Sequence, residues 1–218
     1  MRTDQSGGDN SEYFELFGSP GESLDGLTYL VIGDGSGGSG TIEAVVDLTG
    51  MSIPASGYFL AAESTFENGA GMVFEGVTPD LVTNINFENS DNTTHLLVSG
   101  FTGANADDLD TNDDGVLDSM PWSSIVDGVA LIEEANPPSG TEYEYGTSLG
   151  LEVLGPDGSF VPGQAYRKPD GGPFVIGAFT LGETDTPGAT NIPEPSSLLV
   201  ALMAASGMGA VAMRRRLG

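Results

Sequence analysis

A short acidic stretch holds the residues whose types and spacing could do chemistry. Asp110, Asn112 and Asp114 alternate along the chain, Gly115 follows them, and Asp118 ends the run. In a coiled loop, alternating oxygen-bearing side chains turn toward one centre, a glycine permits the sharp turn, and a backbone carbonyl adds another oxygen. Hard oxygen donors suit Ca²⁺ better than zinc or copper. We therefore predict a structural calcium site with the ligands Asp110, Asn112, Asp114, Val116 and Asp118, and with Asp108 as a further candidate.

The spacing of this run resembles the calcium loops of dockerins and thrombospondin type 3 repeats. It departs from the EF-hand at the last loop position, where Pro121 stands in place of a bidentate glutamate. We expect a Kd on the order of 10⁻⁴ to 10⁻³ M, which extracellular calcium would satisfy. The alternative is an acidic, disordered loop without an ion, because the carboxylates between Asp107 and Asp118 repel one another.

Catalytic residues are harder to assign. His95 is the only histidine and there is no cysteine, so spacing supports neither a Ser-His-Asp arrangement nor a thiolate metal site. His95 lies in an alternating segment, where we expect a structural role. Carboxylates are too numerous for spacing to single out an acid and base pair. We predict a protein that is not an enzyme; the alternative is a secreted hydrolase of extracellular polymers that uses an Asp/Glu pair.

The only tryptophan and the only basic pair before the tail are two further candidates for a binding role. Trp122, the only tryptophan, comes directly after the acidic run. We expect it to pack the exit of the loop onto the fold, and the alternative is an exposed platform for a ligand. Arg167 and Lys168 form the only basic pair before the tail, and we expect them to pair with neighbouring acids.

The net charge of the chain limits the classes of partner that it can bind. Its 32 acidic and 6 basic residues give a net charge of −26 at pH 7. Such a charge repels nucleic-acid phosphates, so we predict no DNA or RNA partner. It also attracts divalent cations. The hydrophobic share of 39% is too high for a disordered polyanion, so we expect one folded domain with a real core.

The C-terminal tail has three parts. Pro193, Glu194 and Pro195 come first, residues 196–213 carry no charge, and Arg214, Arg215 and Arg216 follow. As a helix the uncharged part would span roughly 27 Å, enough for a thin hydrocarbon core. We predict a transmembrane helix over about 196–213 with the arginines on the cytoplasmic side. The alternatives are a buried terminal helix and an unprocessed tail anchor.

This order of parts resembles the PEP-CTERM protein-sorting signal of Gram-negative bacteria. The resemblance implies that an exosortase recognises Pro193, Glu194 and Pro195, with the arginine cluster completing the signal. It implies an inner-membrane intermediate, followed by cleavage and delivery to the cell surface or the extracellular matrix. Export also requires an N-terminal signal, and residues 1–10 contain no apolar stretch. We therefore expect the true N-terminus to lie upstream, and residues 1–10 to be disordered.

The rest of the chain reads as short strands between glycine and proline turns. We expect strands over residues 12–17, 27–32, 41–48, 57–62, 94–99 and 125–132, and shorter ones over 71–74, 81–87, 149–154, 159–161 and 174–179. The segment 125–132 is mostly apolar and is therefore expected at the centre of a sheet. No helical period precedes the tail. This pattern predicts an all-β sandwich or barrel.

Four segments are similar to the lamin-tail domain. They are residues 12–17 (EYFELF), 24–29 (LDGLTY), 53–61 (IPASGYFLA) and 185–191 (DTPGATN). The resemblance implies an immunoglobulin-like β-sandwich over 11–191, interrupted by an acidic insertion over 63–150 and followed by the tail at 192–218. It also implies a binding or scaffold module without catalytic residues of its own. We expect a role in structure or adhesion, with extracellular polysaccharide as a candidate partner.

Overall fold

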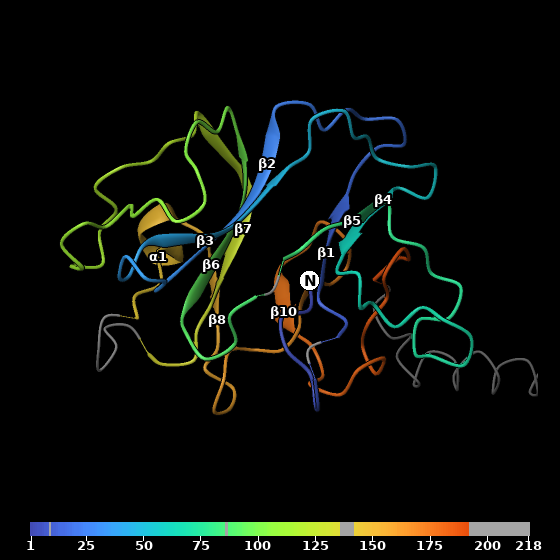
Figure 1. Ribbon diagram of the computed structural model, residues 1–218. Coiled ribbons are helices and arrows are strands. Elements are labelled where there is room, and N and C mark those ends of the chain that lie inside the picture. The colour runs from blue at the N-terminus through green and yellow to red at the C-terminus, as the bar shows by residue number, and fades with distance from the viewer. Residues whose placement is uncertain (9, 86, 136–141, 192–218) are drawn as a thin grey trace, which may run out of the picture.

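A computed structural model describes residues 1–8, 10–85, 87–135 and 142–191 of the chain. These residues form β-strands with a single helical turn, so the all-β prediction is confirmed (Figure 1). The strands are β1 (Tyr13–Phe17), β2 (Leu27–Gly33), β3 (Thr41–Asp47), β4 (Tyr58–Ala62), β5 (Leu81–Val82), β6 (Thr93–Ser99), β7 (Ser124–Leu131), β8 (Glu152–Leu154), β9 (Ala165–Arg167) and β10 (Phe174–Ile176), and the helix is α1 (Gly146–Leu149).

The strands form two main sheets and a hairpin. The larger sheet has the order β3-β2-β6-β7-β8, and the smaller one has the order β1-β4-β5. Strands β9 and β10 pair antiparallel. The ladders are antiparallel except for β4–β5 and β7–β8. Figure 1 shows the two main sheets on opposite sides of the molecule, with β10 below and between them.

The larger sheet is buried on both faces. Along β2, Tyr29 and Val31 point into the core shared with the smaller sheet, whereas Leu30 and Ile32 point into a second core on the far face. Successive strand residues face opposite sides, so a strand covered on both faces must be apolar throughout. The sequence LTYLVIG meets this demand.

The core between the sheets is rich in aromatic rings. The Phe14 ring from β1 stacks on the Tyr29 ring from β2, with centroids 3.8 Å apart and an interplanar angle of 6°. Phe59 from β4 and Val46 from β3 belong to the same cluster. These contacts fix the two sheets face to face.

The far face of the larger sheet is covered by the acidic segment between β6 and β7 and by the segment around α1 (Figure 1). Leu109 and Tyr145 are almost fully buried there. The same segment also protects the exposed edge of β3, because Ala106 N–H donates to Ile42 O at 2.7 Å and Ile42 N–H donates to Asp107 O at 2.9 Å. An edge strand covered in this way cannot pair with another chain.

Several strand predictions are wrong or shortened. Residues 71–74 form a turn, in which Gly71 has a φ of 79°. Residues 159–161 are not a strand, and of the residues described within 81–87 only Leu81–Val82 form a strand. The start of 149–154 instead completes α1, which Gly150 ends with a left-handed φ of 73°. Strand β9 was not predicted, because its short sequence AYR carries no alternating pattern.

Two domain-level expectations are corrected. The N-terminal residues are packed rather than disordered, since Arg2 is fully buried and its backbone bridges to Tyr13 and Gln164. The segment 63–150 is no peripheral insertion, because β6 and β7 lie inside the larger sheet. The acidic stretch between these two strands is a loop. Both errors concern residues whose partners are distant in the sequence.

The predicted transmembrane helix over about 196–213 lies outside the described residues. Within the described ranges, no helix has the length and apolar character needed to cross a bilayer.

The segment 185–191 closes the smaller sheet. The Tyr58 hydroxyl on β4 lies 2.7 Å from Asp170 Oδ2 and 2.8 Å from Thr190 Oγ1. Gly188 N–H donates to Glu15 on β1, and Asn191 N–H donates to Asp170 at 3.1 Å. Three of the four segments on which the lamin-tail prediction is based therefore meet at one place.

Removing the Tyr58 hydroxyl tests this closure. We expect Tyr58→Phe to lower the free energy of unfolding by about 1–2 kcal/mol, because two partly buried hydrogen bonds are lost while the ring stays in place. Urea unfolding of the variant and the wild type measures the difference. An unchanged midpoint would show that these hydrogen bonds do not hold the closing segment.

Candidate functional site

The acidic loop is built around one buried carboxylate. Asp110 has no exposed surface, whereas Asn112, Asp114, Val116 and Asp118 lie on the outside of the loop. Asp110 Oδ1 accepts the Asp114 N–H at 3.2 Å, and Asp110 Oδ2 accepts the Gly115 N–H at 2.8 Å and the Tyr145 hydroxyl at 2.8 Å. Asp110 thus ties the loop to the segment beside α1.

The backbone of this loop is tightly coiled. Asp113 has a φ of 51° and Gly115 has a φ of 81°, both in the left-handed region. A Cβ on Gly115 would lie 2.7 Å from the ring of Tyr143, so the ring packs where a side chain would otherwise be. Glycine at this position therefore permits both the turn and the close packing.

The outer residues of the loop bond within it. Asp114 Oδ1 accepts the Val116 N–H at 3.0 Å, and Asp114 Oδ2 lies 3.1 Å from Asn112 Nδ2. Asp118 Oδ2 accepts the backbone N–H and the hydroxyl of Thr111, at 2.9 Å and 2.5 Å. Asp108 Oδ1 accepts the Asp110 N–H at 3.0 Å. The loop closes on itself between Thr111 and Asp118.

The donor set of this loop fits a hard cation. Every candidate ligand offers an oxygen, from a side chain or, at Val116, from the backbone carbonyl. A carboxylate oxygen that accepts one hydrogen bond keeps a second lone pair. One more carboxylate oxygen, Oδ1 of Asp113, is buried without a hydrogen-bond partner beside Gly38. The calcium site at Asp110, Asn112, Asp114, Val116 and Asp118 stays a prediction.

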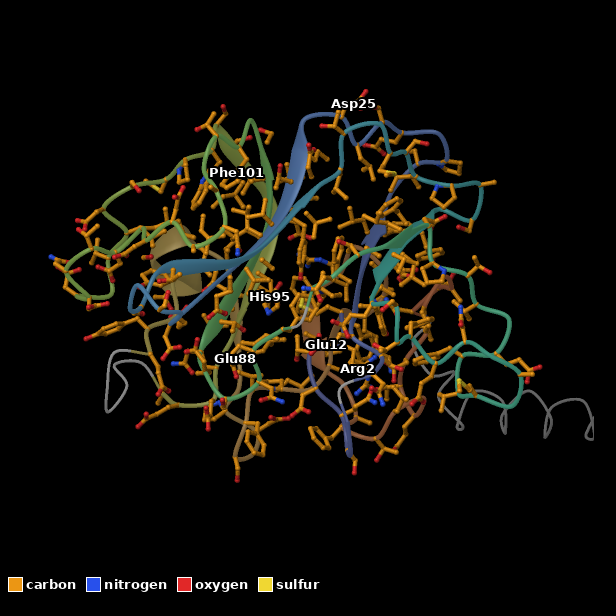
Figure 2. All side chains as sticks on the ribbon, viewed as in Figure 1. Arg2, Glu12, Asp25, Glu88, His95 and Phe101 are labelled. Carbon is orange, nitrogen blue, oxygen red and sulfur yellow. The ribbon has the colours of Figure 1, made fainter. Side chains whose placement is uncertain are left out.

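His95 and Trp122 have the structural roles that we expected. His95 lies between the two sheets, where Nδ1 is 2.8 Å from the Tyr29 hydroxyl and Nε2 is 3.1 Å from the Thr93 hydroxyl (Figure 2). Burial lowers the pKa of His95 to about 3, so the ring is neutral. Trp122 packs against the core beneath the acidic loop.

A cavity of about 310 Å³ opens between β1 and β7. Its walls include Glu15, Asp127, Arg167 and Asp170. Burial raises the pKa of Glu15 to about 7, with Asp170 and Asp80 adding to the effect. Arg167 pairs with Asp127 at 2.5 Å and with Glu152 at 3.7 Å, as expected for this basic residue. Because Asp170 already holds the closing segment, it is not a free catalytic partner for Glu15.

Sequence patterns missed two groups of residues. Arg2 and Asp185 form a buried ion pair, and Asp34, Glu43 and Asp91 converge at one end of the larger sheet. Neither group has a local motif, since its members are brought together only by the fold.

Comparison with known families gives one match. The PEP-CTERM protein-sorting motif matches residues 191–216. This motif implies export and sorting by an exosortase-type system. No curated protein and no solved structure matches the chain. The match covers the tail, and it leaves the function of the β-sheet domain to be argued from its own residues.

Proposed function

We propose that this chain is an exported, non-enzymatic module that acts in structure or adhesion at the cell surface or in the extracellular matrix. The single observation that carries the proposal is the sorting motif at residues 191–216. The exosortase-type enzyme would recognise Pro193, Glu194 and Pro195. The uncharged stretch before Arg214, Arg215 and Arg216 would hold the intermediate in the inner membrane.

Calcium is the cofactor that we propose for the acidic loop. The buried Asp110 carboxylate, the left-handed turn at Gly115 and the oxygen-only donor set support this assignment. The ion would offset part of the net charge of −26, and this negative charge favours the binding of a cation. It would stabilise the cover over the far face of the larger sheet, because Leu109 lies beside the loop in that core.

We also propose that the β-sheet domain is lamin-tail-like and immunoglobulin-like. The contacts of β1 and β4 with the segment 185–191 support this, since they join three of the segments on which the resemblance is based. A module of this type would bind a partner, with extracellular polysaccharide as our candidate, rather than transform a substrate.

A hydrolase of extracellular polymers is the second candidate. The raised pKa of Glu15 in a cavity favours it, because a general acid must be protonated near neutral pH. The engagement of Asp170 with Tyr58 and Asn191 counts against it. Hydrolysis of a polysaccharide panel that is lost in Glu15→Gln would favour the enzyme over the binding module.

Release from the membrane tests the sorting proposal. We express the chain behind a secretion signal in a bacterium that carries an exosortase, and compare it with Glu194→Ala. We expect the wild type in the surface or medium fraction and the variant retained in the membrane, because the recognition segment is damaged. Glu183→Ala, an exposed acidic residue before the tail, serves as the matched control. Equal release of Glu194→Ala would contradict recognition at this segment.

A further inference from the structure

Three carboxylates from separate elements meet at one end of the larger sheet. Asp34 follows β2, Glu43 lies on β3, and Asp91 precedes β6. Among the described residues they are the one group of three acidic side chains with ligand oxygens within 4.8 Å of one another. Two oxygens bound to one Ca²⁺ at 2.3–2.6 Å are at most about 5 Å apart, so the spacing suits a single ion.

Two oxygens of this group are buried and have no hydrogen-bond partner. Asp91 is 2% exposed, and its Oδ2 accepts the Asp34 N–H at 2.7 Å. Its Oδ1 has no partner, and neither has Glu43 Oε2. A buried polar atom left unpaired costs free energy, and a buried carboxylate costs more than a neutral group. Such atoms call for an unseen ligand.

Within the described ranges, no ion pair involves Asp34, Glu43 or Asp91. Arg2 pairs with Asp185, and Arg167 pairs with Asp127 and Glu152. Further negative charge comes from Glu88 and Glu142. Glu88 precedes β6 in the sequence and lies near its start in Figure 2. Burial, followed by the charges of Glu88 and Asp34, raises the pKa of Glu43 to about 7. Burial is also the largest cause of the raised pKa of Asp91.

Gly33 leaves the space in which these side chains meet. A Cβ on Gly33 would lie 2.3 Å from Glu43 Oε2 and 2.7 Å from Asp91 Oδ2. The backbone does not require glycine there, because Gly33 is absent from the positions with positive φ. The missing side chain therefore makes room for two carboxylates.

The neighbour of Asp91 holds it rigidly. Asn92 Oδ1 accepts the N–H groups of Glu133 and Glu134, at 2.7 Å and 3.0 Å, and Asn92 Nδ2 donates to Glu142 O at 2.7 Å. A ligand fixed in this way loses little conformational freedom when an ion binds.

We propose that Asp34, Glu43 and Asp91 form a divalent cation site, with Ca²⁺ as the ion, separate from the acidic loop. Three carboxylates provide up to six oxygens, and water reaches the partly exposed Asp34 to complete the coordination. The ion ties the β2–β3 turn to the start of β6. This turn also touches the acidic loop, because Leu109 N–H donates to Gly40 O at 3.0 Å.

Calcium titration calorimetry of the full-length chain in a non-ionic detergent tests the site. The Asp114→Ala chain serves as the parent, so that the acidic loop does not contribute. We expect this parent to bind calcium, and the added change Asp91→Asn to abolish the binding. The Asn oxygen can still accept the Asp34 N–H, and one buried charge is gone. The melting temperature of the metal-free Asp91→Asn chain should therefore equal or exceed that of its parent.

Two further variants separate the site from general electrostatics. Glu43→Gln, on another strand, should abolish binding in the same parent. Glu142→Gln makes the same charge change beside the group without removing one of its ligand oxygens, so binding should persist. A parent that binds no calcium, or binding that survives both Asp91→Asn and Glu43→Gln, would overturn the site. Neither result bears on the sorting motif or on the calcium loop, whose variants are measured separately.

Discussion

Replacing Asp185 with asparagine should cost about 3–5 kcal/mol of folding free energy, because it leaves a buried arginine without its counter-charge. Both side chains of the pair are fully buried. Arg2 Nε and Nη2 donate to the two Asp185 oxygens at 2.8 Å and 2.5 Å. The hydroxyl of Tyr13 and the amide of Gln164 also donate to Asp185, at 2.9 Å and 3.1 Å.

The remaining arginine donors are satisfied by the chain as well. They reach the carbonyls of Asp4, Phe179 and Ala178, at 3.0 Å, 3.3 Å and 3.1 Å. The pair therefore joins the N-terminal residues to the closing segment. A chain that begins at residue 11 would lack Arg2 and would leave Asp185 without its counter-charge. Any preparation for stability measurements should keep residues 1–10.

Urea unfolding of Asp185→Asn measures the loss, with Asp127→Asn as the matched control. Asp127 pairs with Arg167, but their side chains are 46% and 25% exposed. A pair of this kind contributes about 0–1 kcal/mol. Equal losses of folding free energy in the two variants would contradict the larger contribution that we expect from the buried pair.

Asp110→Ala should have the second largest effect, in two separate parts. Without metal, the variant leaves two backbone N–H groups without their acceptor and removes one of the two partners of the Tyr145 hydroxyl, which keeps Ser39 Oγ at 3.0 Å; this costs about 1–3 kcal/mol. With calcium at a hundredfold excess over Kd, the wild type should gain about 2.7 kcal/mol that the variant does not.

Asp114→Ala separates these two parts, because its side chain is exposed. We expect it to lose the part of the calcium-dependent shift that comes from the loop, about 2.7 kcal/mol at a hundredfold excess over the Kd of the loop, and to keep any part that comes from Asp34, Glu43 and Asp91. Its metal-free stability should stay close to that of the wild type. Thermal unfolding with calcium and with a chelator measures both parts, and Asp157→Ala, an exposed acidic residue elsewhere, is the control. A full calcium shift that survives in both loop variants would refute the ligand assignment at Asp110 and Asp114.

The main strands could be predicted from the sequence because their patterns are local. The runs that became β2, β6 and β7 are long and rich in β-branched residues, and the turns around them carry glycine. Short strands were less predictable. β5 and β9 pair because β4 and β10 lie beside them in the fold, and not because of a pattern in their own two or three residues.

The candidate sites also differ in whether their residues are close together in the sequence. The acidic loop is a contiguous motif, and the sequence predicted its residues together. Arg2 and Asp185 lie 183 positions apart, and Asp34, Glu43 and Asp91 come from three elements. No periodicity or spacing rule links such positions, because only tertiary packing brings them together. The buried N-terminus was missed for the same reason, since its polar composition resembles that of a mobile end.

The most direct test of the central claim, export and sorting through the tail, is the intact mass of the wild-type protein recovered from the surface or medium of cells that carry an exosortase. We expect a species that has lost the residues after the region of Pro193, Glu194 and Pro195, with the uncharged stretch and the three arginines removed. A full-length mass found only in the membrane fraction would contradict this claim, and would favour an unprocessed tail anchor.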